Sequence, residues 1–177
     1  IGYADSRHPD SVSFVNNVTE DLARRDFTMN AIAYSPYDGI VDPFCGYRDI
    51  QNKIIRTVGD PYKRFSEDAL RILRALRFSS VLGFEIEDNT AKAVFELAEN
   101  LKFVSSERIY TEMKKLVCGT NAQFVINEYI QVFKTILPIN GDYKAIHKLP
   151  NDHAMRLYCL FGESYIDALT VLRADNK

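Results

Sequence analysis

Asp68 and Arg71 are the residues of this sequence whose types and spacing most clearly suggest chemistry. They fall in a stretch where apolar residues recur at helical spacing, from residue 61 to residue 82, and a separation of three places two side chains together on one helical face. A carboxylate accepts hydrogen bonds and a guanidinium donates them. The pair therefore either closes into a local ion pair or presents an acceptor and a donor, side by side, to a ligand.

Arg74 and Arg77 continue this series at the same spacing. Arg77 shares its helical face with Leu70 and Leu73, and burial of a guanidinium is costly unless an opposite charge accompanies it. We therefore predict a carboxylate partner for Arg77. A purely structural ion pair is the alternative to a ligand contact.

The charge around these residues is uneven. Eight basic and four acidic residues lie between Arg48 and Phe78, so this segment carries a formal charge of +4 and the rest of the chain −6. A basic segment in an acidic protein favours a surface that faces phosphate, with a solvated charged helix as the alternative. The basic residues are Arg48, Lys53, Arg56, Lys63, Arg64, Arg71, Arg74 and Arg77.

The composition of the whole chain is that of a globular protein. Its 177 residues are 46% hydrophobic and 26% charged, which is typical of one or two folded domains. The net charge of −2 gives no overall attraction to nucleic acid or to an anionic membrane. Any polyanion must therefore be bound locally.

Membrane spanning, secretion and a cysteine-based metal site are all disfavoured. The sequence has no apolar run of about 18 residues and no secretory leader. Its three cysteines, Cys45, Cys118 and Cys159, are odd in number and far apart, so neither a disulfide framework nor a zinc site is expected. A reducing compartment, the cytoplasm, fits this pattern.

The elements that must position the charged residues divide into two kinds. The first 58 residues mix short strands and turns, and the pattern predicts strands at residues 11–15, 30–34, 39–43 and 53–58, with short helices after Thr19 and over residues 47–52. From residue 61 onward, helical spacing predicts helices over residues 61–82, 90–101, 106–117, 122–137, 152–161 and 165–173.

These elements predict an α+β fold of three parts. Residues 1–58 are the mixed part, and residues 59–120 and 121–177 are two helical parts. Glu85-Ile86-Glu87 lies just past the basic helix, in a region that we interpret as a surface turn.

Four sequence blocks resemble the class II tRNA nucleotidyltransferases, the CCA-adding enzymes, and the bacterial poly(A) polymerases related to them. Residues 20–31 contain Arg24-Arg25-Asp26-Phe27-Thr28, and residues 56–61, 64–78 and 82–84 resemble the nucleotide-reading block of that family. The two weaker blocks are Asp42-Pro43-Phe44 with Gly46 and Asp49, and Ser106-Glu107-Arg108-Ile109 with Glu112. The resemblance implies the end of a nucleotidyltransferase palm followed by the neck and body.

The same resemblance implies roles for seven residues. Asp68 and Arg71 would read the base: cytosine and adenine both carry an amine donor next to an unprotonated ring nitrogen, which guanine and uracil reverse. Arg25 would hold triphosphate oxygens, and Asp26 and Asn30 would contact ribose or only brace their turn. The arginines expected to complete the nucleotide site are Arg74 and Arg77.

The resemblance also implies CTP, ATP and the tRNA 3′ end as partners, with Mg²⁺ as the cofactor. In this family two metal ions are held by an Asp-x-Asp pair after a glycine-rich turn, upstream of these blocks. This sequence contains no Asp-x-Asp, so we expect no catalytic or metal-binding residue in it, and we interpret it as a piece that is inactive alone. Alternatives are a poly(A) polymerase, an enzyme that adds only C or only A, and a noncatalytic module that senses nucleotides or docks RNA.

Overall fold

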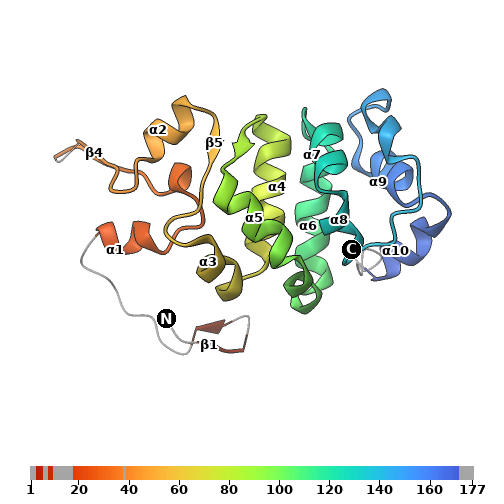
Figure 1. The fold of residues 1–177 in the computed structure, drawn as a ribbon, viewed down its shortest axis with the longest axis horizontal. Coiled ribbons are helices and arrows are strands. Elements are labelled where there is room, and N and C mark those ends of the chain that lie inside the picture. Colours follow the sequence, from red (N-terminus) through yellow and green to blue (C-terminus); the bar gives the residue numbers. More distant parts are fainter. Residues whose placement is uncertain (1–2, 6–7, 10–17, 38, 172–177) are drawn as a thin grey trace.

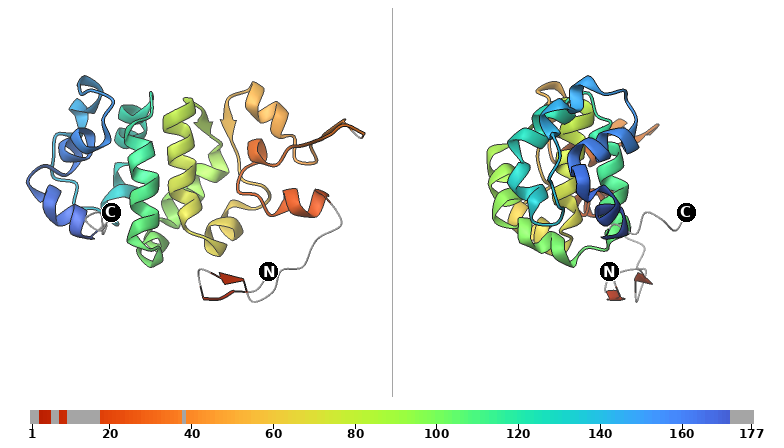
Figure 2. Two further views of the ribbon diagram at one scale, coloured as in Figure 1. Left: turned by 180° about the vertical axis from the view of Figure 1, so that it is seen from behind. Right: turned by 90° about the vertical axis from the view of Figure 1, so that its right-hand side faces the viewer.

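The protein is elongated, and from α1 onward its elements broadly follow chain order along the long axis (Figure 1). The computed structural model describes residues 3–5, 8–9, 18–37 and 39–171. The mixed α and β elements occupy one end and the helices α9 and α10 the other, as the view from behind also shows (Figure 2). The predicted α+β class is confirmed.

Short elements form the first part. The hairpin of β3 (Ala33–Ser35) and β4 (Gly39–Val41) is antiparallel, with Ala33 opposite Val41. The predicted strand over residues 30–34 begins later, because residues Thr28–Asn30 form the 3-10 helix η1. The predicted strand at residues 11–15 lies outside the described residues. The other elements here are β1 (Tyr3–Asp5), β2 (His8–Pro9), α1 (Val18–Ala23) and α2 (Gly46–Gln51).

One parallel strand pair connects this first part to the helices. β5 (Ile54–Ile55) pairs with β6 (Glu85–Ile86), with Ile54 opposite Glu85. The interpretation of residues 85–87 as a surface turn was therefore wrong for the first two of them. Ile55 of β5 is fully buried, and burial of this apolar side chain stabilises the pairing of β5 with β6.

The single helix predicted over residues 61–82 is in fact two helices. α3 (Pro61–Glu67) ends at Asp68, whose backbone is extended, and α4 (Leu70–Leu82) begins two residues later. Asp68 Oδ1 accepts a hydrogen bond from the Leu70 backbone nitrogen at 3.1 Å. An aspartate side chain can hydrogen-bond the nearby backbone in place of a continuing helix. The spacing of apolar residues does not reveal such a break.

The remaining helices follow the predicted order. α6 (Ser106–Val117) matches its predicted bounds, whereas residues 122–137 form two shorter helices that meet at Tyr129. The others are α5 (Asp88–Glu96), η2 (Ala98–Phe103), α7 (Ala122–Glu128), α8 (Ile130–Lys134), η3 (Tyr143–Lys148), α9 (His153–Phe161), η4 (Gly162–Ser164) and α10 (Tyr165–Val171).

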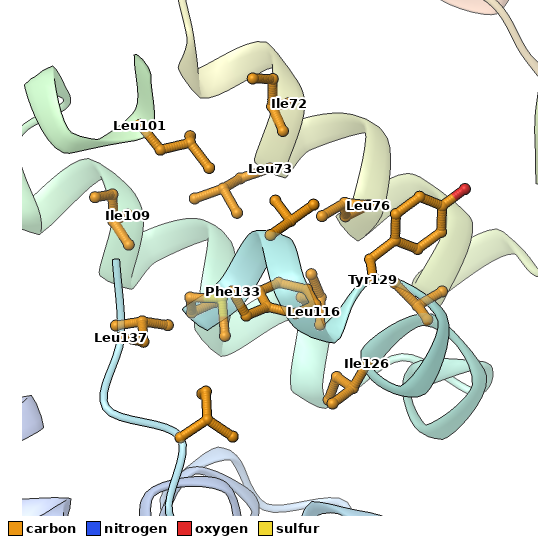
Figure 3. Packing of buried hydrophobic residues seen from close by; sticks show 14 of the residues in the cluster. Ile72, Leu73, Leu76, Leu101, Ile109, Leu116, Ile126, Tyr129, Phe133 and Leu137 are labelled. Atoms are coloured by element: carbon orange, nitrogen blue, oxygen red, sulfur yellow. The ribbon is translucent and has the colours of Figure 1, made fainter. Parts of the chain in front are cut away.

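One cluster of buried apolar side chains runs through these helices, from Phe65 to Ala168. Figure 3 shows Leu73 and Leu76 of α4 packed close to Leu116 of α6 and Phe133 of α8. Burial of this face stabilises the pairing of α4 with α6. The divisions at residues 58 and 120 both stay predictions.

Within the described ranges, no helix is both long enough and apolar enough to cross a lipid bilayer.

Candidate functional site

A cavity of about 540 Å³ lies where the end of α1, the start of α4 and α6 come together. Six of the seven site residues predicted from the sequence line it. Five arginines and two aspartates stand in its wall, so it favours an anionic ligand, and its volume suits a small molecule. The lining residues are Arg24, Arg25, Asp26, Asn30, Asp68, Leu70, Arg71, Arg74 and Arg108.

Arg25 is the most accessible of the predicted phosphate contacts. Its Nη2 donates to Asp21 Oδ2 at 3.0 Å, one helical turn back along the chain, and more than half of both side chains is exposed. Such an exposed pair contributes little to stability. Arg25 can therefore exchange Asp21 for a ligand oxygen at small cost.

Asp26 braces the turn that follows α1. Its Oδ1 accepts hydrogen bonds from the Phe27 backbone nitrogen at 2.9 Å and from Asn30 Nδ2 at 3.1 Å. Its Oδ2 accepts from Arg74 Nε at 2.7 Å. The bracing alternative is therefore observed for both Asp26 and Asn30, while their contact with ribose stays a prediction.

The prediction that Asp68 and Arg71 lie on one continuous helix was wrong. Asp68 lies in the break between α3 and α4, and its Oδ2 accepts from Arg108 Nη2 of α6 at 2.8 Å. Within the described part of the chain, no ion pair joins Asp68 to Arg71. The structure nevertheless places both side chains in the same cavity wall.

Arg71 is held by α3 instead. Its Nη1 donates to Glu67 Oε2 and to the Arg64 carbonyl oxygen, both at 2.9 Å. Glu67 also accepts from Arg64 Nη1 at 2.9 Å. Partial burial opposes ionisation of Glu67, but the hydrogen bonds from Arg64 and Arg71 outweigh it and lower the pKa of this carboxyl group.

Arg77 does not line the cavity. Its Nε donates to Glu112 Oε2 at 2.6 Å, and the side chains are only 13% and 7% exposed. Its guanidinium also lies 3.7 Å from the centre of the Phe78 ring. The predicted carboxylate partner is confirmed as Glu112. The expected contact of Arg77 with the nucleotide stays a prediction, one that this placement does not favour.

The basic segment forms a ligand-facing surface only in part. Arg56 pairs with Asp49 and Glu87, both at 3.2 Å. Arg64 donates to the Val58 carbonyl at 2.8 Å as well as to Glu67. Several of these cations therefore hold the fold together, and those at the cavity are Arg71 and Arg74.

Two arginines that line the cavity, Arg24 and Arg108, were not predicted as site residues. Both stand inside the blocks that carry the family resemblance, which was the only available signal. Helical periodicity could not find them, because one precedes α4 and the other lies 40 residues after Asp68.

Among the described residues, no cluster of three or more histidine, cysteine, aspartate or glutamate side chains could hold a metal ion. The three cysteines are free. A separate apolar groove of about 620 Å³ lies between α9 and α10, lined by Met155, Tyr158 and Tyr165 among others. It contains no arrangement suited to phosphate.

Two family models match the chain. Residues 1–56 match "Poly A polymerase head domain", and residues 83–138 match "Probable RNA and SrmB- binding site of polymerase A". The chain is 52% identical over 122 residues to the CCA-adding enzyme of Lactobacillus helveticus, an alignment that covers 69% of this chain and 31% of that relative. The chain thus spans about a third of the length of the curated relatives that it matches.

Solved structures of CCA-adding enzymes are also similar to this chain. The CCA-adding enzyme of Bacillus stearothermophilus in complex with CTP superimposes with a TM-score of 0.80 at 35% identity, over 91% of this chain and 44% of that one. The CCA-adding enzyme of Thermotoga maritima complexed with tRNA gives 0.71 at 26% identity, over 89% and 44% of the two chains.

Proposed function

Because the chain belongs to the family of the CCA-adding enzymes and the poly(A) polymerases related to them, we propose that it recognises the incoming nucleotide in a tRNA nucleotidyltransferase. This enzyme would add C and A to the 3′ end of tRNA from CTP and ATP, without a nucleic acid template. The proposal is supported by relatives that carry the name CCA-adding enzyme and by similar structures solved with CTP and with tRNA.

The observation that carries the proposal is the presence of Asp68 and Arg71 in one electropositive cavity. The Asp68 carboxylate would accept from the exocyclic amine of cytosine or adenine, and the Arg71 guanidinium would donate to the neighbouring ring nitrogen. Uracil and guanine present a carbonyl oxygen and a protonated ring nitrogen there, and both mismatch the pair.

Other residues that line the cavity suit the rest of the nucleotide. Arg25 would bind triphosphate oxygens, because its exposed partner Asp21 is easily released. Arg74 would keep Asp26 and its turn in place through their ion pair, so that Asp26 and Asn30 can meet the ribose hydroxyls. Arg77 would contribute indirectly, because Arg77 and Arg74 both pair with Glu112.

Magnesium is the proposed cofactor of the complete reaction, in which it spreads the charge that develops on the transferred phosphate. The described residues include no cluster that fits such a cation. No catalytic step is therefore assigned to residues of this chain, and the 177-residue chain alone is expected to add no nucleotide.

The test asks whether the full-length protein extends a tRNA that lacks its CCA end when CTP, ATP and Mg²⁺ are supplied. We expect products longer by two C residues and one A. Long A tails would indicate a poly(A) polymerase instead, and a stop after C or addition of A alone would indicate an enzyme of partial specificity. Nucleotide binding without extension would indicate a noncatalytic module.

A further inference from the structure

We propose that Arg108 is a positioning residue for base recognition, which acts by fixing the Asp68 carboxylate in the cavity. This inference rests on the proposed function and deepens it. It concerns a residue of α6 that pairs with Asp68 across 40 positions of sequence. Asp68 and Arg71 form the base-reading pair, and Arg108 would hold its acceptor half, Asp68.

Asp68 needs such a support because it is not part of a helix. Its backbone is extended between α3 and α4, so neither helix fixes the direction of its side chain. Two hydrogen bonds do so instead. The Leu70 backbone nitrogen holds Oδ1 at 3.1 Å, and Arg108 Nη2 holds Oδ2 at 2.8 Å.

The two halves of the base-reading pair therefore have separate supports. Arg71 is held from α3 by Glu67 and the Arg64 carbonyl, whereas Asp68 is held from α6. A change at Arg108 should disturb the acceptor for the exocyclic amine and leave the donor to the ring nitrogen in place. The reaction should then lose its discrimination between cytosine, which has the amine, and uracil, which has a carbonyl oxygen there.

Arg108 is placed to act on Asp68 without supporting the core. Its side chain is 45% exposed and that of Asp68 is 33% exposed. Both residues also line a second cavity of about 670 Å³. Neither side chain belongs to the apolar cluster of the helices, so loss of the pair should leave that cluster intact.

The experiment compares CTP with UTP for the wild-type protein, for Arg108→Gln, and for the matched control Lys115→Gln, which removes an exposed positive charge from the same helix. Arg108→Gln should lower the ratio of kcat/KM for CTP over UTP about tenfold, the effect of one lost hydrogen bond to a charged group. Lys115→Gln should leave the ratio unchanged. A lower melting temperature with an unchanged ratio would show a merely structural role and overturn the inference.

A double-mutant cycle tests whether Arg108 acts through Asp68. If it does, Arg108→Gln should change the CTP to UTP ratio little once Asp68→Ala is present. Equal effects in both backgrounds would mean that Arg108 acts elsewhere, which overturns the inference.

Equilibrium binding of CTP and UTP to the 177-residue chain repeats the comparison without catalysis. Failure to add C and A in the full-length protein, with the binding preference lost in Arg108→Gln, would reject the proposed function and keep this inference. Addition of C and A with a selectivity that Arg108→Gln does not alter would reject this inference alone. A wild-type chain that binds CTP and UTP equally would overturn it too.

Discussion

Arg77 of α4 and Glu112 of α6 form a buried ion pair, with 2.6 Å between Nε and Oε2. Glu112 also lies 4.0 Å from Arg74 Nη1, and Arg74 in turn contacts Asp26. A line of alternating charges therefore runs from the helical core to the turn that forms one wall of the cavity. This line couples the packing of α4 on α6 to the shape of the candidate site.

Loss of the Glu112 charge should destabilise the fold. Glu112→Gln leaves the Arg77 guanidinium buried without its counter-charge, and breaking a buried pair in this way costs about 3 kcal/mol. Denaturant unfolding of the chain would measure this change in the free energy of unfolding. Glu107→Gln, on the exposed side of the same helix, should change the free energy of unfolding by less than about 0.5 kcal/mol. Equal values for the two variants would contradict this prediction.

Removal of the Asp68 carboxylate should abolish selectivity for C and A. In the full-length protein, Asp68→Ala loses a charged hydrogen bond worth roughly 1.5–3 kcal/mol, so kcat/KM for CTP and ATP should fall by about one to two orders of magnitude. The kcat/KM for UTP and GTP should fall much less, because the carboxylate repels their carbonyl oxygens. Incorporation of all four nucleotides, measured beside the melting temperature, checks this. Intact selectivity in a folded variant would reject base reading by Asp68.

Removal of Arg25 should affect both nucleotides equally. A phosphate contact carries no information about the base, so Arg25→Ala should raise KM for CTP and ATP alike, by about tenfold. The matched control is Asp21→Ala, which removes the exposed partner of Arg25 and should change KM by about twofold or less. A defect confined to CTP or to ATP would instead place Arg25 at the base edge.

Glu87 should contribute stability that depends on pH. Its Oε2 accepts from the Thr90 backbone nitrogen at 2.9 Å, at the start of α5, and its Oε1 pairs with Arg56 at 3.2 Å. Burial opposes ionisation of Glu87, but these contacts outweigh it, so its pKa is lowered in the folded state. The stabilisation is therefore complete above the unfolded pKa and is lost as the pH falls through the folded pKa.

Glu87→Gln should accordingly cost about 1 kcal/mol at pH 7, the usual contribution of a helix cap. The difference from wild type should shrink as the pH falls through the lowered pKa of the folded protein, because the wild-type carboxyl group is then protonated. Melting curves of both proteins between pH 7 and pH 3 would show this. A difference that stays constant across that range would mean that the charge of Glu87 contributes nothing.

Much of the candidate site could be predicted from local sequence. The 3.6-residue spacing of apolar residues located α6 to the residue, and the position of Arg77 among leucines indicated that it needed a carboxylate partner. Six of the seven site residues that the family resemblance implied line one cavity.

Only the tertiary structure decided how these residues are held. Local spacing predicted Asp68 and Arg71 together on one helix, but the Asp68 side chain binds the Leu70 backbone nitrogen and the helix breaks there. Its partner Arg108 comes from α6, and β5 pairs with β6 rather than leaving residues 85–86 in a turn. Such contacts join residues far apart in the chain. Which of them form depends on how buried apolar faces pack the helices together, and no local pattern records that packing.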